Sequence, residues 1–165
     1  MEFNDVYDKY RNPTGKLHCR GTRWKYGEFG LVVCVWVYDG EGNLLLTRRA
    51  PGKSFAGTWE NSGGAVKAGE NSRTAIAREL FEETGIRCDG FTEIGRYLVG
   101  GTAIFHCFFC TVDVDKSAVR LQEGETVDYM WLTEEEFIRF LRSDKVIESQ
   151  IRRYRPYYEK MGYMK

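Results

Sequence analysis

The chain has 165 residues, with 24 Lys and Arg against 24 Asp and Glu, so its formal net charge is zero. That length fits one domain with a full hydrophobic core. The balanced charge argues against a nucleic-acid polymer or an anionic membrane surface as a partner. The five cysteines are scattered, the first residues are polar, and no apolar run approaches membrane-spanning length. We therefore expect a single-domain cytoplasmic protein whose thiols are reduced.

The first predicted elements are short strands in an N-terminal extension, residues 1–29. Strands are expected near 6–8 and 17–19, on either side of an Asn-Pro-Thr-Gly turn. An apolar run over 31–38 and a second over 43–47 then flank the sequence Asp-Gly-Glu-Gly. This pattern predicts a β-hairpin.

Two groups of cations stand near these strands. The extension holds a basic and aromatic group, namely Arg20, Arg23, Trp24, Lys25 and Tyr26. This group either stacks on a base and contacts phosphate, or forms an edge hairpin that covers the core. Arg48, Arg49 and Lys53 follow the predicted hairpin. They are candidates to bind a diphosphate, and ordinary surface charge is the alternative.

The segment 72–84 predicts a helix, because Asn71 is a good N-cap, no Pro or Gly interrupts the segment, and Gly85 follows as a stop. Glutamates at i, i+3 and i+4 share one face of this helix: Glu79, Glu82 and Glu83. Ala77, Leu80 and Phe81 are expected to face the core, and Arg78 to point away from the middle of the acidic face. Because like charges repel, we interpret the cluster as ligands for Mg²⁺ or Mn²⁺. An exposed acidic face is the alternative.

Further strands are predicted over 90–101, 103–114 and 127–132, with an acidic loop before the last of them. Cys107 and Cys110 resemble half a zinc site, but their spacing on a strand places the thiols on opposite faces.

The last elements are helical. Thr133 and Glu136 form a capping box for a helix that runs to about Arg142. The tail over 143–165 fits a final helix, a homodimer contact or a loose end. Its composition leaves these alternatives open.

The stretch Gly64 to Ile86 matches the signature of the Nudix hydrolases at every fixed position. These positions are Gly64, Glu70, Arg78, Glu79, Leu80, Glu82, Glu83, Gly85 and Ile86. So many fixed identities rarely coincide by chance. The resemblance implies an α/β fold, namely the Nudix α/β/α sandwich with a mixed β-sheet, whose core covers about 30–142.

The resemblance also implies roles for individual residues. The metal ligands would be Glu79, Glu82, Glu83 and the backbone carbonyl of Gly63. Glu70 and Arg78 would fix the loop and helix through ion pairing. A glutamate of the late acidic loop, Glu123 in first place and Glu125 in second, would join the metal site or activate water. Glu79 is a further candidate for activating the water. The expected activity is Mg²⁺- or Mn²⁺-dependent cleavage of a small-molecule diphosphate.

Two alternatives remain. Outside the signature the sequence resembles isopentenyl-diphosphate isomerase, for example in Asn61-Ser62. That enzyme carries a cysteine and then a histidine just after this pair, whereas Gly63-Gly64 follows here, and its signature is degenerate. The other alternative is a ligand sensor without catalysis, which would not need a water-activating base.

Overall fold

The computed structural model describes residues 1–98 and 101–165. In chain order the strands are β1 (Phe3–Tyr7), β2 (Pro13–Cys19), β3 (Gly30–Asp39), β4 (Leu44–Arg49), β5 (Trp59–Glu60), β6 (Ser62–Ala65), β7 (Thr92–Leu98), β8 (Ala103–Val112) and β9 (Thr126–Leu132). The helices are α1 (Ser72–Thr84), α2 (Glu134–Phe140) and α3 (Glu148–Lys160), with a 3₁₀ turn η1 (Lys116–Ala118). Residues 99–100, part of the strand predicted over 90–101, lie outside the described residues.

Strand β3 is the centre of a mixed sheet. It pairs in parallel with β8 along its whole length, from Gly30 opposite Ala103 to Asp39 opposite Val112. Its other edge pairs antiparallel with β6 and, at Tyr38, with β4. β7 extends the sheet beyond β8, and β5 and β9 both pair with β4. The predicted hairpin and mixed sheet are thus confirmed.

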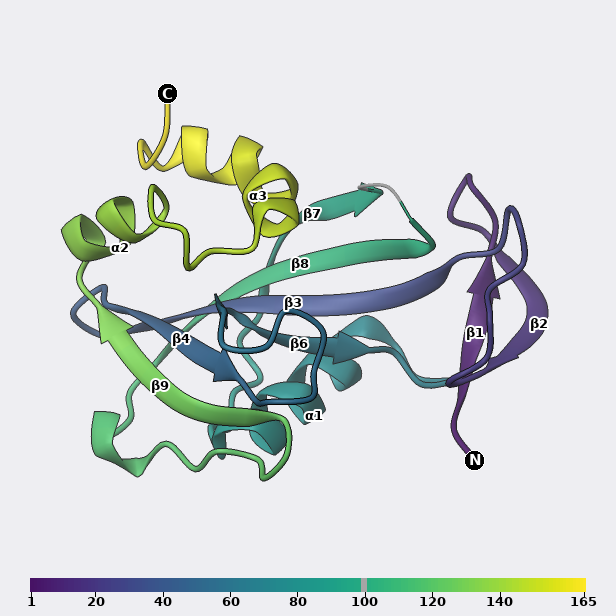
Figure 1. Ribbon diagram of the computed structural model, residues 1–165, viewed down its shortest axis with the longest axis horizontal. Coiled ribbons are helices and arrows are strands. Elements are labelled where there is room, and N and C mark those ends of the chain that lie inside the picture. Colours follow the sequence, from purple (N-terminus) through teal and green to yellow (C-terminus); the bar gives the residue numbers. More distant parts are fainter. Residues whose placement is uncertain (99–100) are drawn as a thin grey trace.

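Helices cover both faces of this sheet, with α1 on one side and α2 and α3 on the other (Figure 1). Because side chains alternate along a strand, β3 contributes residues to two separate hydrophobic cores, one on each face of the sheet. Val33 and Val35 pack toward α1, whereas Trp36 packs with aromatic residues of α2 and α3. Cys110 lies in the first core and Cys107 in the second, which confirms that their thiols are on opposite faces. The molecule is an α/β/α sandwich.

The C-terminal segment is part of the packed body. Tyr154 and Tyr158 of α3 are fully buried, and Trp36 meets Tyr154 edge to face at 5.4 Å between ring centroids. Phe137 of α2 packs on the same tryptophan. The body therefore continues past residue 142, where the sequence placed the end of the core.

The N-terminal strands form their own two-stranded sheet, at the far end of β3 from α2 (Figure 1). It is fastened to the loop before α1: Asn4 Nδ2 donates to the carbonyl of Val66 at 2.8 Å, and the Gly69 N–H donates to Asp5 Oδ2 at 2.8 Å. All five cysteines are free thiols. Within 1–98 and 101–165, none of the helices has the length and apolar character needed to cross a bilayer.

Candidate metal and diphosphate site

Helix α1 has the bounds that the sequence predicts. The Asn71 side chain accepts a hydrogen bond from the Thr74 N–H at 2.9 Å, and Gly85 ends the helix with φ 73°. One expectation is wrong: Phe81 is 41% exposed and lies under the Arg87 guanidinium instead of facing the core. The core side is formed by Ile76 and Leu80. Glu83 lies next to Ile76 on the helical wheel, so it is carried inward.

The two glycines of β6 let this helix lie close to the sheet. A Cβ atom at Gly64 would collide with the carboxylate of Glu79, and one at Gly63 would collide with the backbone carbonyl of Val33. The signature glycine at 64 thus makes room for the Glu79 carboxylate. As a result, the acidic face of α1 sits directly on β6.

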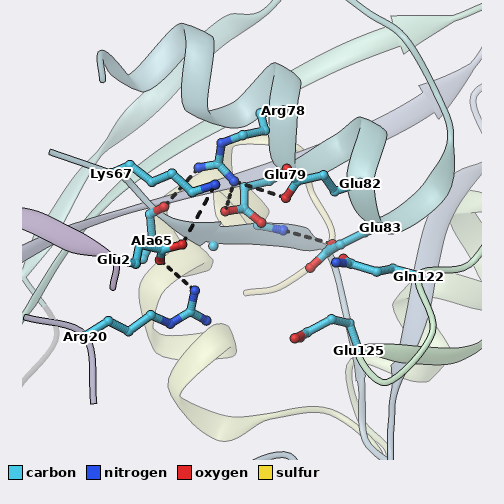
Figure 2. A pocket seen from close by; sticks show the side chains of 12 residues that line it. Glu2, Arg20, Ala65, Lys67, Arg78, Glu79, Glu82, Glu83, Gln122 and Glu125 are labelled. Carbon is cyan, nitrogen blue, oxygen red and sulfur yellow. Dashed lines mark hydrogen bonds and ion pairs between the residues drawn. The ribbon is translucent and has the colours of Figure 1, made fainter. Parts of the chain in front are cut away.

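Arg78 contacts three glutamates, of which Glu79 and Glu82 are drawn in Figure 2. Its Nε and Nη2 donate to the two carboxylate oxygens of Glu70 at 3.0 and 2.9 Å, a bidentate pair. Its Nη1 donates to Glu79 at 2.7 Å and to Glu82 at 3.2 Å. The expectation that Arg78 points away from the acidic face is therefore wrong, because its long side chain folds back over the helix. The expected pairing with Glu70 is present.

Glu83 differs from its neighbours, because among the described residues it has no cationic partner within ion-pair distance. It is 9% exposed and accepts a hydrogen bond from the Gly63 N–H at 3.3 Å. Burial raises its pKa well above that of an ordinary glutamate, and the nearby charges of Glu60 and Glu79 add to the effect. Burial also raises the pKa of Glu79, although Arg78 partly offsets it. For Glu70, the hydrogen bonds from Arg78 and Lys67 outweigh burial and lower the pKa.

These donors have the chemistry that a hard divalent cation requires. Carboxylates close enough to repel, one of them buried and unpaired, are stabilised by a cation that takes oxygen ligands. In the described chain, however, no three acidic, His or Cys side chains are already arranged around one point. The reason is visible in Figure 2: Arg78 lies between Glu79 and Glu82 and holds oxygens that a metal would use.

Two adjoining cavities open beside this helix. The first, which we call the acidic cavity, has a volume of about 240 Å³ and is lined by Glu79, Glu82, Glu83, Arg78 and Gln122, among others. The second, which we call the α3 cavity, has about 330 Å³ and reaches under α3, where Gln150 and Arg153 line it. Gly63, Gly64, Ala65 and Glu83 line both, so the two cavities adjoin.

Two of the three cations predicted after the hairpin reach the α3 cavity. Arg49 forms an ion pair with Glu60, and Lys53 forms one with Glu125. Arg48 is exposed and lines neither cavity, because alternation along β4 turns it away from Arg49.

The late acidic loop and the N-terminal extension also contribute residues to the cavities. Glu125 lines both cavities, whereas Glu123, the first choice from sequence, is exposed and lines neither. Arg20 lines both cavities and pairs with Glu2 at 2.7 Å. Trp24, offered as a base-stacking residue, stacks on His18 instead, with ring centroids 3.6 Å apart.

Several residues that line the cavities were not predicted from the sequence: Lys67, Gln122, Gln150 and Arg153. Gln122 stands in the same loop as the two candidate glutamates and could have been found by its position. Nothing in the local sequence marks Gln150 or Arg153, because only the packing of α3 brings them to the site.

Comparison with solved structures supports the fold. A MutT protein from Methanosarcina mazei Go1 is 26% identical, with a TM-score of 0.65 over 81% of this chain and 93% of that chain. The NUDIX domain of Shewanella oneidensis NrtR, solved with ADP ribose, has a TM-score of 0.62 at 17% identity, over 81% of this chain and 89% of its own.

Sequence comparison identifies relatives of two kinds. An uncharacterised Nudix hydrolase of Listeria monocytogenes is 34% identical over 87% of this chain and 86% of its own length. An isopentenyl-diphosphate Delta-isomerase of Citrobacter koseri is 28% identical over 76% of this chain and 74% of its own. The NUDIX domain family model matches residues 28–154. This chain, with an intact signature over residues 64–86, therefore belongs to the Nudix hydrolase family.

Proposed function

We propose that this protein is an Mg²⁺- or Mn²⁺-dependent hydrolase that cleaves the diphosphate linkage of a nucleoside diphosphate derivative or nucleoside triphosphate. The observation that carries the proposal is Glu83, a buried carboxylate that lines two adjoining cavities and has no cationic partner among the described residues. A purely structural glutamate at this depth would be paired.

The cation would be held by Glu79, Glu82, Glu83 and the Gly63 carbonyl. When bound, it supplies positive charge that offsets the negative oxygens of the diphosphate. Arg78 keeps its bidentate contact with Glu70 and thereby fixes the loop against the helix. Its contacts with Glu79 and Glu82 compete with the cation for the same oxygens.

The remaining residues act on the phosphate and on water. Arg49 and Lys53 line the α3 cavity, where their charges can receive phosphate oxygens. Glu125 lines both cavities, and we expect Glu125 or Glu79 to accept a proton from an attacking water. The water oxygen forms a bond to phosphorus, the P–O–P bridge breaks, and the bridging oxygen leaves with the second phosphoryl group.

A substrate panel tests this proposal. Nucleotide sugars, ADP-ribose, dinucleoside polyphosphates, nucleoside triphosphates and prenyl diphosphates are incubated with Mg²⁺ or Mn²⁺, and products are separated by chromatography. We expect a nucleoside monophosphate from at least one compound. Glu83→Gln should abolish turnover, while Glu135→Gln, at an exposed position of α2, should leave it unchanged. Turnover of Glu83→Gln near the wild-type rate would refute the assignment.

One observation favours the isomerase alternative. The thiol of Cys34 lines the α3 cavity, and the Cα of Cys34 is paired in register with that of Gly63. Isopentenyl diphosphate in the same panel decides the matter, because double-bond migration without release of phosphate would replace hydrolysis as the activity. Calorimetric binding of a nucleotide, with no turnover under any metal, would instead indicate a sensor.

A further inference from the structure

Arg153 is a buried cation on the wall of the α3 cavity, and none of the carboxylates in the described part of the chain forms an ion pair with it. Its side chain belongs to α3, and the residue is 9% exposed. Its guanidinium carbon lies 3.5 Å from the ring centroid of Phe105, so one face of the group is stacked on an aromatic ring. Across residues 1–98 and 101–165, no Asp or Glu oxygen lies within ion-pair distance of it, in contrast to Arg49, which pairs with Glu60.

The hydrogen bonding of this guanidinium is incomplete. Nη1 donates to Sγ of Cys34 at 3.1 Å, and Nε has no partner among the described residues. Sulfur is a weak acceptor. Cys34 is therefore a weak partner for this guanidinium.

The helix that carries Arg153 is held in place by a polar network. Gln150 donates through Nε2 to Oδ1 of Asn61, and Asn61 donates through Nδ2 to the hydroxyl of Tyr154 at 2.8 Å. These contacts tie α3 to the turn between β5 and β6, next to the signature glycines. The position of Arg153 relative to the acidic cavity is thus fixed before any ligand arrives, which reduces the entropy lost on binding.

Burying a charge without a partner is costly, so a residue in this state is expected where a ligand supplies the opposite charge. We propose that Arg153 is the anion-binding residue of a second subsite, which takes a phosphate or carboxylate group that the substrate carries beyond its scissile diphosphate. This inference rests on the proposed function for the identity of the substrate, but the subsite itself can be tested without turnover.

The test is a titration of the metal-free protein with inorganic phosphate, followed by thermal unfolding and by calorimetry. Without a divalent cation, the glutamates of the acidic cavity repel phosphate, so binding reports on the cationic subsite. We expect saturable binding that Arg153→Gln weakens about tenfold or more, since a charge-assisted hydrogen bond is lost. Arg152→Gln is the matched control, because Arg152 is adjacent on α3, is exposed and pairs with Glu148. It should bind like the wild type.

A second variant covers the case in which Arg153→Gln does not fold. Arg153→Lys keeps the buried charge but loses the planar fork and its stacking on Phe105, and it should weaken phosphate binding several-fold. Wild-type affinity in either folded variant, or no saturable binding by the wild type, would overturn the inference. If the substrate panel shows turnover and this titration fails, the subsite alone is refuted. If Arg153-dependent binding is found without any turnover, the proposed hydrolase activity is refuted instead.

Discussion

Replacing Glu83 with glutamine should make the metal-free protein more stable while it removes activity. Glu83 is buried, is repelled by Glu60 and Glu79, and has a raised pKa. Glutamine has nearly the same shape and can still accept the hydrogen bond that the Gly63 N–H gives to the carboxylate. The substitution therefore removes a desolvated charge without opening a cavity.

The sign and size of the effect follow from linkage. Below the pKa of an unfolded glutamate, about 4.3, the carboxyl is protonated in both states and contributes nothing. As pH rises past that value, the unfolded chain releases its proton more readily than the folded protein, so the wild type loses stability until the folded pKa is passed. A buried group left unsatisfied costs about 1–3 kcal/mol, and we expect a gain of that size for the variant near neutral pH. The corresponding rise in Tm is about 2–4 °C per kcal/mol for a chain of this length.

The assay is thermal unfolding with a chelator present, at about pH 4 and about pH 8. Glu83→Gln should match the wild type at the lower pH and exceed it at the higher, and Glu135→Gln, which is exposed, should match the wild type at both. Adding Mg²⁺ should stabilise the wild type more than the variant, because ligand binding to the folded state raises stability. A Glu83→Gln protein that is equally or less stable at the higher pH would refute the account of Glu83 as an uncompensated charge.

Four further substitutions test the site and the fold. Glu125→Gln should lower kcat about 10²–10⁴-fold, as expected for loss of a general base, whereas Glu123→Gln should leave kcat within about twofold of wild type. A larger loss of kcat for Glu123→Gln in steady-state assays would restore the sequence-based preference for Glu123 as the base. Gly64→Ala should lower kcat/KM about 100-fold with an unchanged far-UV circular dichroism spectrum, because the added Cβ displaces the Glu79 carboxylate. Wild-type activity of this variant would contradict the close approach of Gly64 to Glu79. Phe137→Ala should lower the free energy of unfolding by about 3–5 kcal/mol in urea titrations, since Phe137 is fully buried; a loss below about 1 kcal/mol would show that the second core is loosely packed.

The signals that predicted α1 are local, which is why they succeeded. An N-cap at Asn71, a stop at Gly85 and the spacing of the glutamates depend only on neighbouring residues. The predicted directions of the Phe81 and Arg78 side chains were both wrong, because a helical wheel gives only the direction of each Cβ. Packing against the sheet decides which sector of the helix is buried, and a long side chain can fold back across the helix surface.

Other parts of the site depend on contacts between distant segments. Glu123 and Glu125 flank Gly124, whose φ of 79° turns the chain, so sequence order could not tell which of the two carboxylates faces the cavity. The environment of Arg153 could not be predicted from the sequence, because it is formed by Cys34 of β3 and Phe105 of β8. Only the parallel pairing of β3 with β8 brings those residues together under α3.

The position of α3 in the chain has a consequence for biosynthesis. This helix follows every strand, yet it covers the aromatic face around Trp36 and carries Arg153. While a ribosome is still adding α3, this hydrophobic face of the sheet is exposed to solvent and prone to aggregation. We therefore expect truncation before Glu148 to yield insoluble material or a chaperone-bound chain, and not a smaller enzyme with relaxed selectivity.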